Sequence, residues 1–351
     1  MLTGMRVRNF CCFNDQDYNV KFNKLSIVVG PNNSGKSAVF SALNFLRMFT
    51  INHQLQWNSR YYALENHVAA FYSHKIGATM ILEMRYDAES QNYQAELNIT
   101  GNTISVDKLK INGTHVAGLS YGTNIEFVRK IWYFSPNRNL IPYQIGVGGT
   151  GDGLQPLSPS GNDISQFLIQ RWTDQDPNWN LAQEWFKKFD PKMLLLKTPL
   201  VSNQVHLETQ RNDGQSEISV NLSLQGNGMQ NLTTIVSAII FSPKGNTIII
   251  EEPENYLNSK SIEFLVDLFN YAVNNLDKQI IITTHSWDII NAYCSDIGEG
   301  TDRGNNHEKA KPEDFKLIVF TEELGPDKIQ EYDLQGKKYT DVRNYFKDLW
   351  G

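Results

Sequence analysis

The pattern of apolar and polar positions predicts a chain that combines buried strands with helices. Three short runs, Leu25–Val29, Asn246–Ile250 and Gln279–Thr283, are almost continuously apolar, as expected of strands covered on both faces. Apolar residues at helical spacing occur at 38–49, 231–240 and 259–275. Buried strands that alternate with helices predict an α/β fold.

The middle of the chain has a different pattern. Between 77 and 130 the apolar runs are short and are separated by Gly101-Asn102 and Asn112-Gly113, which are hairpin signals and predict an antiparallel sheet. The other predicted elements are a strand at 131–134, a Gly-, Ser- and Pro-rich loop at 144–162, helical structure over 163–196, a hairpin at 204–224, strands at 315–320 and 328–333, and a helix at 339–350. No heptad repeat is found, which excludes a long coiled coil.

Composition narrows the class of protein. The 351 residues include 32 Lys and Arg against 38 Asp and Glu, a formal charge of −6. A hydrophobic fraction of 40% and a charged fraction of 20% are ordinary for a globular protein and exclude a disordered or fibrous chain. The acidic balance excludes a globally basic nucleic-acid coat, although it leaves room for a local basic patch. The length is compatible with one large domain or with two domains.

Cysteine usage and hydropathy indicate the compartment. The three cysteines form no CxxC pair, and the neighbours Cys11 and Cys12 would not easily bond to each other, so we expect a reducing compartment and no structural zinc. No apolar run approaches the roughly 20 residues of a membrane helix, and the N-terminus lacks the apolar segment of a secretory signal. We therefore expect a cytoplasmic protein with no membrane partner.

The strongest local signal is GPNNSGKS at Gly30–Ser37, a P-loop pattern placed between a buried strand and a helix. Its backbone N–H groups are expected to surround phosphates, with the lysine as a point charge and the serine hydroxyl on Mg²⁺. The helix that begins there points its positive end at the anion. The pattern predicts ATP and Mg²⁺ as cofactors. The expected nucleotide-binding residues are Gly30, Asn32, Asn33, Ser34, Gly35, Lys36 and Ser37.

Polar side chains follow the other two buried strands. Glu251 could be held near Mg²⁺, directly or through water, while Glu252 could polarise the attacking water as a general base. His285 follows the third strand and is expected to contact the γ-phosphate or that water. An acidic strand end or a single histidine is often merely structural, but the P-loop upstream favours the catalytic interpretation.

Other candidates for anion contacts are weaker. The sequence QGNGMQ at 225–230 places two glycines at the start of a predicted helix, where free N–H groups could bind an anion. It could serve the same nucleotide or one held by a second subunit, and a plain hairpin-to-helix turn is the alternative. Arg6, Arg8 and Arg138 could touch phosphate or nucleic acid, but we expect them to be solvated or structurally paired.

The order GPNNSGKS, QGNGMQ, IIIEEPE and TTHS resembles the ATP-binding-cassette ATPases of the RecF and SMC branch. Within it the sequence is most similar to OLD-family (overcoming lysogenisation defect) ATPase domains and to small AAA-type ATPases of prokaryotic defence systems, such as those of Septu and retrons. Met5–Phe10, with Phe13 after it, is similar to the strand-and-turn start of that group. The resemblance covers 1–50 and 222–290, whereas 51–200 matches only in general style.

The resemblance implies a role for each motif. Lys36 and Ser37 would belong to Walker A, and Glu251 would be the Walker B acid. Glu252 would be the catalytic glutamate, and His285 the switch histidine. The signature, which completes a partner subunit's site in a head-to-tail dimer, would consist of Asn227, Gly228 and Gln230. It also implies an ABC-ATPase-like P-loop fold with a mixed or parallel core sheet, an antiparallel β lobe and a helical lobe. Residues 1–50 and 222–351 would form the ATP-binding core, and 51–221 an inserted β-rich lobe followed by a helical segment.

The expected function is Mg²⁺-dependent ATP hydrolysis by a homo-oligomer, at least a dimer, that gates or senses for a separately encoded effector in anti-phage defence. OLD proteins carry a C-terminal TOPRIM nuclease, whereas the segment after His285 has no cluster of acids on strands that would bind metal for cleavage. We therefore expect the nuclease or other effector to be a separate subunit.

Two alternatives remain open at this stage. A RecF-like DNA-repair ATPase would bind duplex DNA with a steep dependence on salt, and the net acidity argues mildly against it. An ATP-binding assembly scaffold would change its oligomeric state with nucleotide but would hardly turn over. A transporter motor fits less well, because those motors prefer an LSGGQ-like signature.

Overall fold

In the computed structural model, the described residues include most of the buried strands and helices that the sequence predicts. The described residues are 1–52, 79–86, 91–100, 103–111, 114–115, 129–136, 138, 143–144, 157–197, 200–201, 204–205, 208–212, 216–294, 311–322, 325 and 328–332. The predicted helix at 339–350 and most of the predicted loop at 144–162 lie outside these residues. Among the helices within them, none is long and apolar enough to cross a bilayer.

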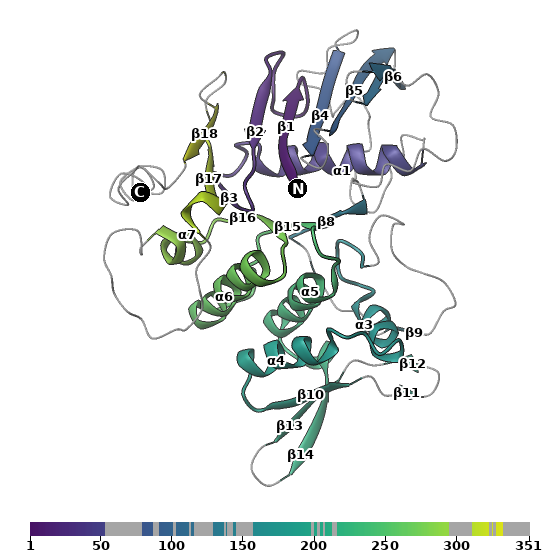
Figure 1. Ribbon diagram of the computed structural model, residues 1–351, viewed down its shortest axis with the longest axis vertical. Coiled ribbons are helices and arrows are strands. Elements are labelled where there is room, and N and C mark those ends of the chain that lie inside the picture. The colour runs from purple at the N-terminus through teal and green to yellow at the C-terminus, as the bar shows by residue number, and fades with distance from the viewer. Residues whose placement is uncertain are drawn as a thin grey trace.

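A six-stranded sheet lies at the centre of the molecule, with the order β18-β17-β3-β16-β15-β8 (Figure 1). Its strands are β3 (Leu25–Val29), β8 (Ile131–Phe134), β15 (Thr247–Glu251), β16 (Gln279–Thr283), β17 (Phe315–Phe320) and β18 (Ile329–Tyr332). All pairs are parallel except β17–β18. Thr283 pairs with Glu251 on one side and with Val28 on the other, so the loops after β3, β16 and β15 meet at one edge of the sheet.

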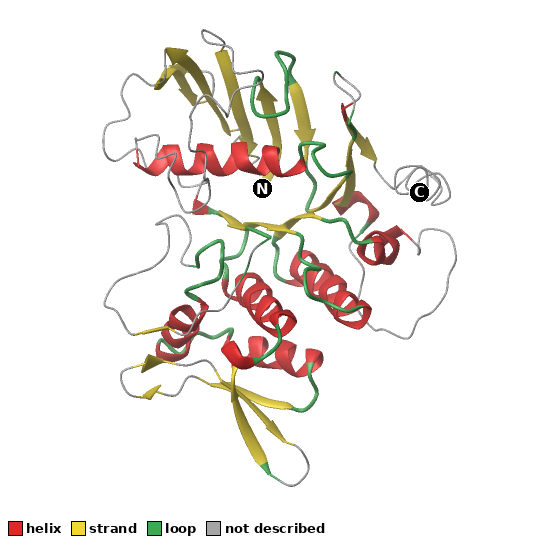
Figure 2. Cartoon of the chain, turned by 180° about the vertical axis from the view of Figure 1, so that it is seen from behind, coloured by secondary structure: helices red, strands yellow, loops and turns green. Residues whose placement is uncertain are grey.

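Helices cover both faces of this sheet (Figures 1 and 2). On one face lie α3 (Ile164–Thr173), α4 (Trp179–Phe189), α5 (Asn227–Phe241), α6 (Ser259–Asn275) and α7 (Trp287–Cys294), and on the other lies α1 (Lys36–Asn52). Successive residues of β3 serve the two faces, since Ile27 packs with the large helical layer and Val28 packs in the core that contains α1. Because helices cover both faces of the sheet, the central strands are continuously apolar in sequence.

A second, antiparallel sheet covers the far side of α1, with the order β2-β1-β4-β5-β6-β7. Its strands are β1 (Leu2–Arg8), β2 (Tyr18–Lys21), β4 (Thr79–Tyr86), β5 (Gln91–Thr100), β6 (Thr103–Ile111) and β7 (Thr114–His115). The predicted hairpins are therefore confirmed. So is the predicted fold class, an α/β fold with a mainly parallel core sheet, an antiparallel β lobe and a helical lobe.

Two small sheets extend the helical side. One contains β10 (Met193–Lys197), β13 (Glu208–Asn212) and β14 (Glu217–Asn221), and the other contains β9 (Tyr143–Gln144), β11 (Leu200–Val201) and β12 (Gln204–Val205). The prediction of helix through residue 196 is wrong at its end. Pro191 follows α4 and cannot continue it, and the residues from Met193 onward pair with β13 instead.

Strands from the stretch 51–221 take part in both large sheets. β4 pairs with β1, and β8 pairs with β15. The two sheets are thus shared between this stretch and the flanking ones, and the division into a core of 1–50 with 222–351 and an inserted 51–221 stays a prediction.

Lys278 closes the C-terminal end of α5. It is 4% exposed, and its Nζ donates to the carbonyl oxygen of Ile239 and to the carbonyl and hydroxyl oxygens of Ser242, at 2.7 and 2.9 Å for the latter two. Burial lowers the pKa of Lys278 to about 7, with the charge of Asp176 opposing the shift. The ammonium group satisfies carbonyls that the helix itself leaves without donors.

Replacing Lys278 with methionine is expected to lower the free energy of unfolding by about 2 kcal/mol, because buried carbonyl oxygens lose their donors. Chemical denaturation at pH 6, where Lys278 is charged, measures the loss. Lys244→Met is the matched control, since the Lys244 side chain is 79% exposed beside the same helix end and should cost less than about 0.5 kcal/mol. Equal stability of both variants would contradict the capping role.

Candidate active site

The P-loop connects β3 to α1 and depends on glycine at two positions. Gly30 has φ +149° and Gly35 has φ +106°, values that residues with a Cβ rarely adopt. A Cβ at Gly30 would lie 2.3 Å from the carbonyl oxygen of Phe320, and one at Gly35 would lie 2.6 Å from Sγ of Cys12. The loop is therefore fitted between the end of β17 and the turn after β1.

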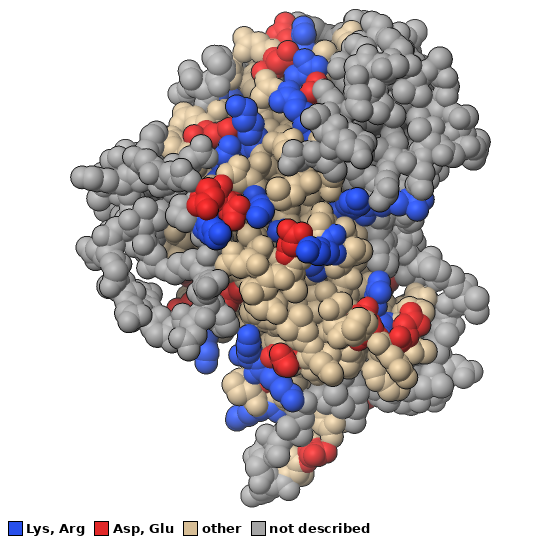
Figure 3. Space-filling view, in the orientation of Figure 1, with Lys and Arg blue, Asp and Glu red and all other residues tan. Residues whose placement is uncertain are grey.

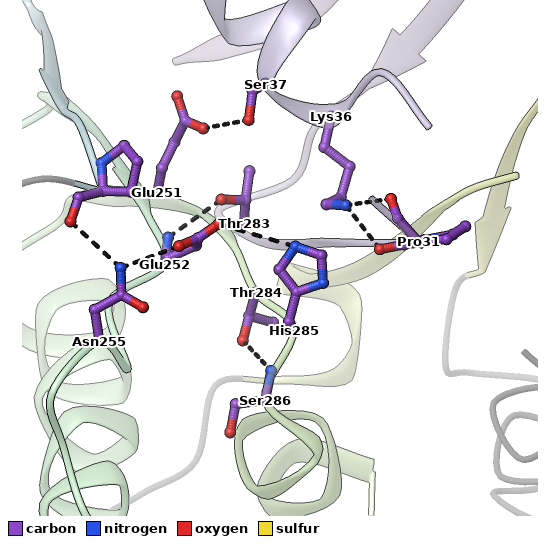
Figure 4. A network of polar contacts seen from close by, with 12 residues as sticks. Pro31, Lys36, Ser37, Glu251, Glu252, Asn255, Thr283, Thr284, His285 and Ser286 are labelled. Atoms are coloured by element: carbon purple, nitrogen blue, oxygen red, sulfur yellow. Dashed lines mark hydrogen bonds and ion pairs between the residues drawn. The ribbon is translucent and has the colours of Figure 1, made fainter. Parts of the chain in front are cut away.

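The Lys36 ammonium lies inside the curl of this loop (Figure 4). Its Nζ donates to the carbonyl oxygens of Gly30 and Pro31 at 2.7 and 2.8 Å. Burial lowers the pKa of Lys36 to about 8, while the charges of Glu252 and Glu251 oppose the shift. Phosphate oxygens would be stronger acceptors for this cation than neutral carbonyls.

The other predicted P-loop residues differ in exposure. Asn32, Asn33 and Ser37 are exposed, whereas Ser34 is fully buried and faces Gly30 rather than the surface. Only the backbone of Ser34 is therefore placed to serve a phosphate. Its assignment as a nucleotide-binding residue stays a prediction, as do those of Asn32 and Asn33.

Ser37 and Glu251 form the predicted metal site. The Ser37 hydroxyl donates to Oε2 of Glu251 at 2.7 Å, and the Tyr133 hydroxyl donates to Oε1 at 2.5 Å. Burial raises the pKa of Glu251, and the two hydrogen bonds oppose that shift. Hydroxyl and carboxylate oxygens are the ligands that Mg²⁺ prefers, so this pair of side chains fits the cation that the P-loop implies.

Glu252 lies next to this pair but in a different environment. Its side chain is 34% exposed, with Oε2 accepting from Nδ2 of Asn255 at 3.0 Å and Oε1 lying 3.9 Å from Nε2 of His285. Its N–H donates to the carbonyl oxygen of Thr283 at 2.9 Å. The buried carboxylate of Glu251 holds a hydroxyl, whereas the half-exposed carboxylate of Glu252 can reach water.

The loop that carries His285 is attached to the acidic loop through Glu254. Oε1 of Glu254 accepts from the Thr284 hydroxyl at 2.6 Å and from the N–H groups of His285 and Ser286 at 2.9 and 3.1 Å. Burial and the positive charge of Lys36 lower the pKa of His285, and Glu252 opposes them. The imidazole is therefore neutral near pH 7, able to accept or donate a hydrogen bond.

The sequence prediction missed four of the residues that organise the site, and it named a fifth, Arg138, only as a charge expected to be solvated or structurally paired. Tyr133 and Arg138 follow or end β8, Asn255 and Glu254 follow β15, and Asn231 lies on α5. The position of the strand at 131–134 was a usable signal, because the end of another parallel strand would bring its side chains to the same edge. Arg138 is structurally paired, as expected, although its partners are mostly backbone carbonyls.

Of the three predicted signature residues, Gly228 lines a pocket of ≈ 520 Å³. Asn227 is exposed at the start of α5, and a Cβ at Gly228 would lie 2.7 Å from the carbonyl oxygen of Tyr256. Gln230 is buried, and its Nε2 donates to the carbonyl oxygen of Gln225 at 2.9 Å, so its amide stabilises the turn before its own helix. The described residues that line this pocket include none of Gly30–Ser37.

Two family models match the sequence. One, described as "AAA ATPase domain", covers 150–290, and the other, described as "AAA domain", covers 2–101. The first match therefore contains Glu251, Glu252 and His285, and the second contains the P-loop. Each of the two matches covers less than half of the chain.

Two solved structures, both SMC head domains, show that the chain has an SMC-head-like fold. A SmcHead bound to the C-winged helix domain of ScpA superposes with a TM-score of 0.58 at 12% identity, covering 95% of this chain and 98% of that chain. An Smc head domain with an extended coiled coil, bound to the C-terminal domain of ScpA derived from Pyrococcus furiosus, gives 0.57 at 11% identity, covering 100% and 99%. No curated protein matches the chain in sequence. The narrower resemblance to OLD and defence ATPases stays a prediction.

ATP binding is expected to weaken as the pH rises above about 8. Lys36 is charged below its pKa of about 8 and neutral above it, and the phosphates bind the charged form. Above pH 8, each further pH unit should reduce the affinity for Mg-ATP by about tenfold. This decline should end at the pKa that Lys36 has in the ATP-bound state, which is higher than its pKa in the free protein. Titration of Mg-ATP from pH 7 to 9.5 at constant ionic strength tests this, with Lys36→Met expected to give a flat profile. A flat profile in the unmodified protein would contradict it.

Proposed function

We propose that the protein is a Mg²⁺-dependent ATPase that hydrolyses ATP to ADP and phosphate. One observation carries the proposal. Lys36, Ser37, Glu251, Glu252 and His285 come from distant parts of the sequence, yet all lie at the ends of three adjacent parallel strands (Figure 4). Ligands of open α/β sheets bind at this edge.

The side chains have distinct parts in the proposed reaction. Lys36 exchanges two carbonyl partners for phosphate oxygens, and Mg²⁺ held by Ser37 and Glu251 supplies neutralisation of phosphate charge. Glu252 accepts a proton from the attacking water, and its half-exposed carboxylate has room for that water. Neutral His285, beside Glu252, orients the water or donates to the γ-phosphate.

We also propose that ATP closes a head-to-tail dimer. The pocket lined by Gly228 is separate from the P-loop within one chain, which supports a site completed by a second copy. Two large apolar side chains stand exposed near that pocket, Leu224 at 81% and Tyr256 at 60%. Burial of such residues against a partner is favourable. ATP would join the two copies, and hydrolysis would release them.

The proposed biological role is to gate or sense for a separately encoded effector, a nuclease, in anti-phage defence. The motif order supports this role through the resemblance to OLD and defence ATPases. The two SMC heads of similar fold are each bound to a part of ScpA, a separate chain. An effector of this protein would likewise be a separate chain that docks on the head.

A DNA-binding role of the RecF kind is the second candidate. Arg6 on β1 forms ion pairs with Glu83 at 2.7 Å and Asp17 at 3.5 Å, so its charge is already compensated. On the face in Figure 3, basic and acidic side chains of the described residues are interspersed rather than gathered by sign. These observations rank DNA binding below effector gating, and a salt titration of duplex binding would measure it.

Turnover and oligomeric state together test the proposal. The purified chain is expected to hydrolyse ATP only with Mg²⁺, and light scattering should detect dimers with ATP but monomers with ADP. Dimers with ATP but no turnover would instead support an assembly scaffold. Hydrolysis that survives removal of Mg²⁺ by a chelator would contradict the proposed site.

A further inference from the structure

We propose that Arg138 and Asn231 are positioning residues for Glu252. Through their hydrogen bonds, the position of Glu252 depends on α5, the helix that begins with the predicted signature residues. We call these two residues the relay. This inference rests on the proposed ATPase function. It concerns two buried side chains that hydrogen-bond to each other and to the backbone of the acidic loop.

Arg138 binds the backbone of the acidic loop. The residue is 2% exposed, and its guanidinium donates to the carbonyl oxygens of Ser135, Glu251 and Glu252 at 2.5, 2.7 and 2.7 Å. Burial lowers the pKa of Arg138 to about 10, and the acidic residues around it oppose the shift. A buried cation is unfavourable unless its donors are used. The donors of Arg138 hold the carbonyl groups of Glu251 and Glu252, the residues on which metal binding and base catalysis would depend.

The backbone of Glu252 needs such support. Its φ of +47° lies in the left-handed region, which is unfavourable for a residue with a side chain. Strained residues of this kind persist only where the surroundings fix them. Arg138 fixes the carbonyl group of Glu252, and Thr283 fixes its N–H group.

Asn231 connects this arrangement to α5. Its Oδ1 accepts from Nε of Arg138 at 2.7 Å, and its Nδ2 donates to the carbonyl oxygens of Pro253 and Asn255 at 3.0 and 2.8 Å. The Asn255 side chain in turn donates to the Glu252 carboxylate. One side chain of α5 therefore reaches Glu252 by two routes, through Arg138 to the backbone and through Asn255 to the carboxylate.

The same helix begins with the signature residues. Asn227 and Asn231 are four residues apart, so they lie one above the other on one face of α5. One turn of α-helix, about 5.4 Å, separates these two residues. Contact of the signature end with a partner's nucleotide would therefore move Asn231 and, with it, the acidic loop. The relay would make the placement of the base sensitive to dimer closure.

Asn231→Asp separates this role from simple packing. Aspartate has the same size and can still accept from Arg138, but it cannot donate to Pro253 and Asn255. We expect kcat to fall about tenfold or more, as for other small displacements of reacting groups, with the Kd for Mg-ATP nearly unchanged. The Tm should also fall, because two carbonyl oxygens lose their donor. Arg138→Met is expected to lower kcat in the same way and to lower the Tm further, because three carbonyl oxygens lose their donor. If this variant fails to fold, Asn231→Asp decides alone.

Thr233→Val is the matched control, because Thr233 is a buried polar residue of α5 whose hydroxyl donates to Met229 of its own helix. It should retain wild-type kcat.

A second readout uses nucleotide-free protein: amide hydrogen exchange in 251–256 should be faster in Asn231→Asp and unchanged in the control. Unchanged kcat and exchange in Asn231→Asp would overturn the relay while leaving ATP hydrolysis by the wild type intact. A fall in the affinity for Mg-ATP as large as the fall in kcat would also overturn it. Absence of turnover in the wild type would instead refute the proposed function.

Discussion

Glu252→Gln is expected to reduce ATP hydrolysis by about 100-fold or more while ATP binding is retained. The amide keeps the size of the side chain and can still contact Asn255, but it cannot accept a proton from water. Hydrolysis is the step that reopens the proposed dimer, so the variant should also accumulate as an ATP-bound dimer. Single-turnover kinetics and light scattering with Mg-ATP measure the two effects.

Glu263→Gln is the control for this experiment. Glu263 is exposed on α6, and its substitution should leave both kcat and the oligomeric state unchanged. Hydrolysis at the wild-type rate in Glu252→Gln would remove Glu252 from the role of general base.

Lys36→Met is expected to weaken ATP binding by about 30-fold or more. Loss of one partner from a buried charged contact costs about 2 kcal/mol or more, and about 1.4 kcal/mol corresponds to a factor of ten in affinity. Calorimetric titration with Mg-ATP and a thermal melt measure affinity and stability separately.

Lys21→Met provides the comparison, since Lys21 is an exposed lysine on β2 and should bind ATP as the wild type does. Equal affinity of the two variants would show that the P-loop cation does not meet the nucleotide.

The P-loop and the polar ends of the strands could be predicted because their signals are local. The run Leu25–Val29 followed by GPNNSGKS gives both the strand and the turn, and IIIEEPE and TTHS repeat the pattern of a buried strand with a polar end. Parallel pairing then brings these ends to one edge, a general property of such sheets. The contact of Ser37 with Glu251, across 214 residues of sequence, follows from that rule.

The supporting residues could not be predicted in the same way. The strand at 131–134 was evident, but nothing local states that it lies beside β15. That neighbour relation places the Tyr133 hydroxyl on Glu251, 118 residues away, and the Arg138 guanidinium on the acidic loop. Asn231 is hidden for a similar reason, since it stands in an apolar helix and its partners come from another loop.

The signature shows where residue type alone misleads. A glutamine beside two glycines suggests an outward-facing contact, yet the Gln230 amide is bonded to the turn that precedes its helix. The exposed Asn227 and the free space beside Gly226 are better placed to meet a partner. The nucleotide contacts of Asn227, Gly228 and Gln230 stay predictions.

The structure of Glu252→Gln with Mg-ATP is the most direct test of the account. We predict that Nζ of Lys36 leaves the carbonyl oxygens of Gly30 and Pro31 for the terminal phosphates, that Ser37 and Glu251 hold Mg²⁺ directly or through water, and that position 252 and His285 face the γ-phosphate. Nucleotide bound elsewhere, with Lys36 still on its own loop, would contradict the central claim that one triphosphate site is assembled from these three strand ends.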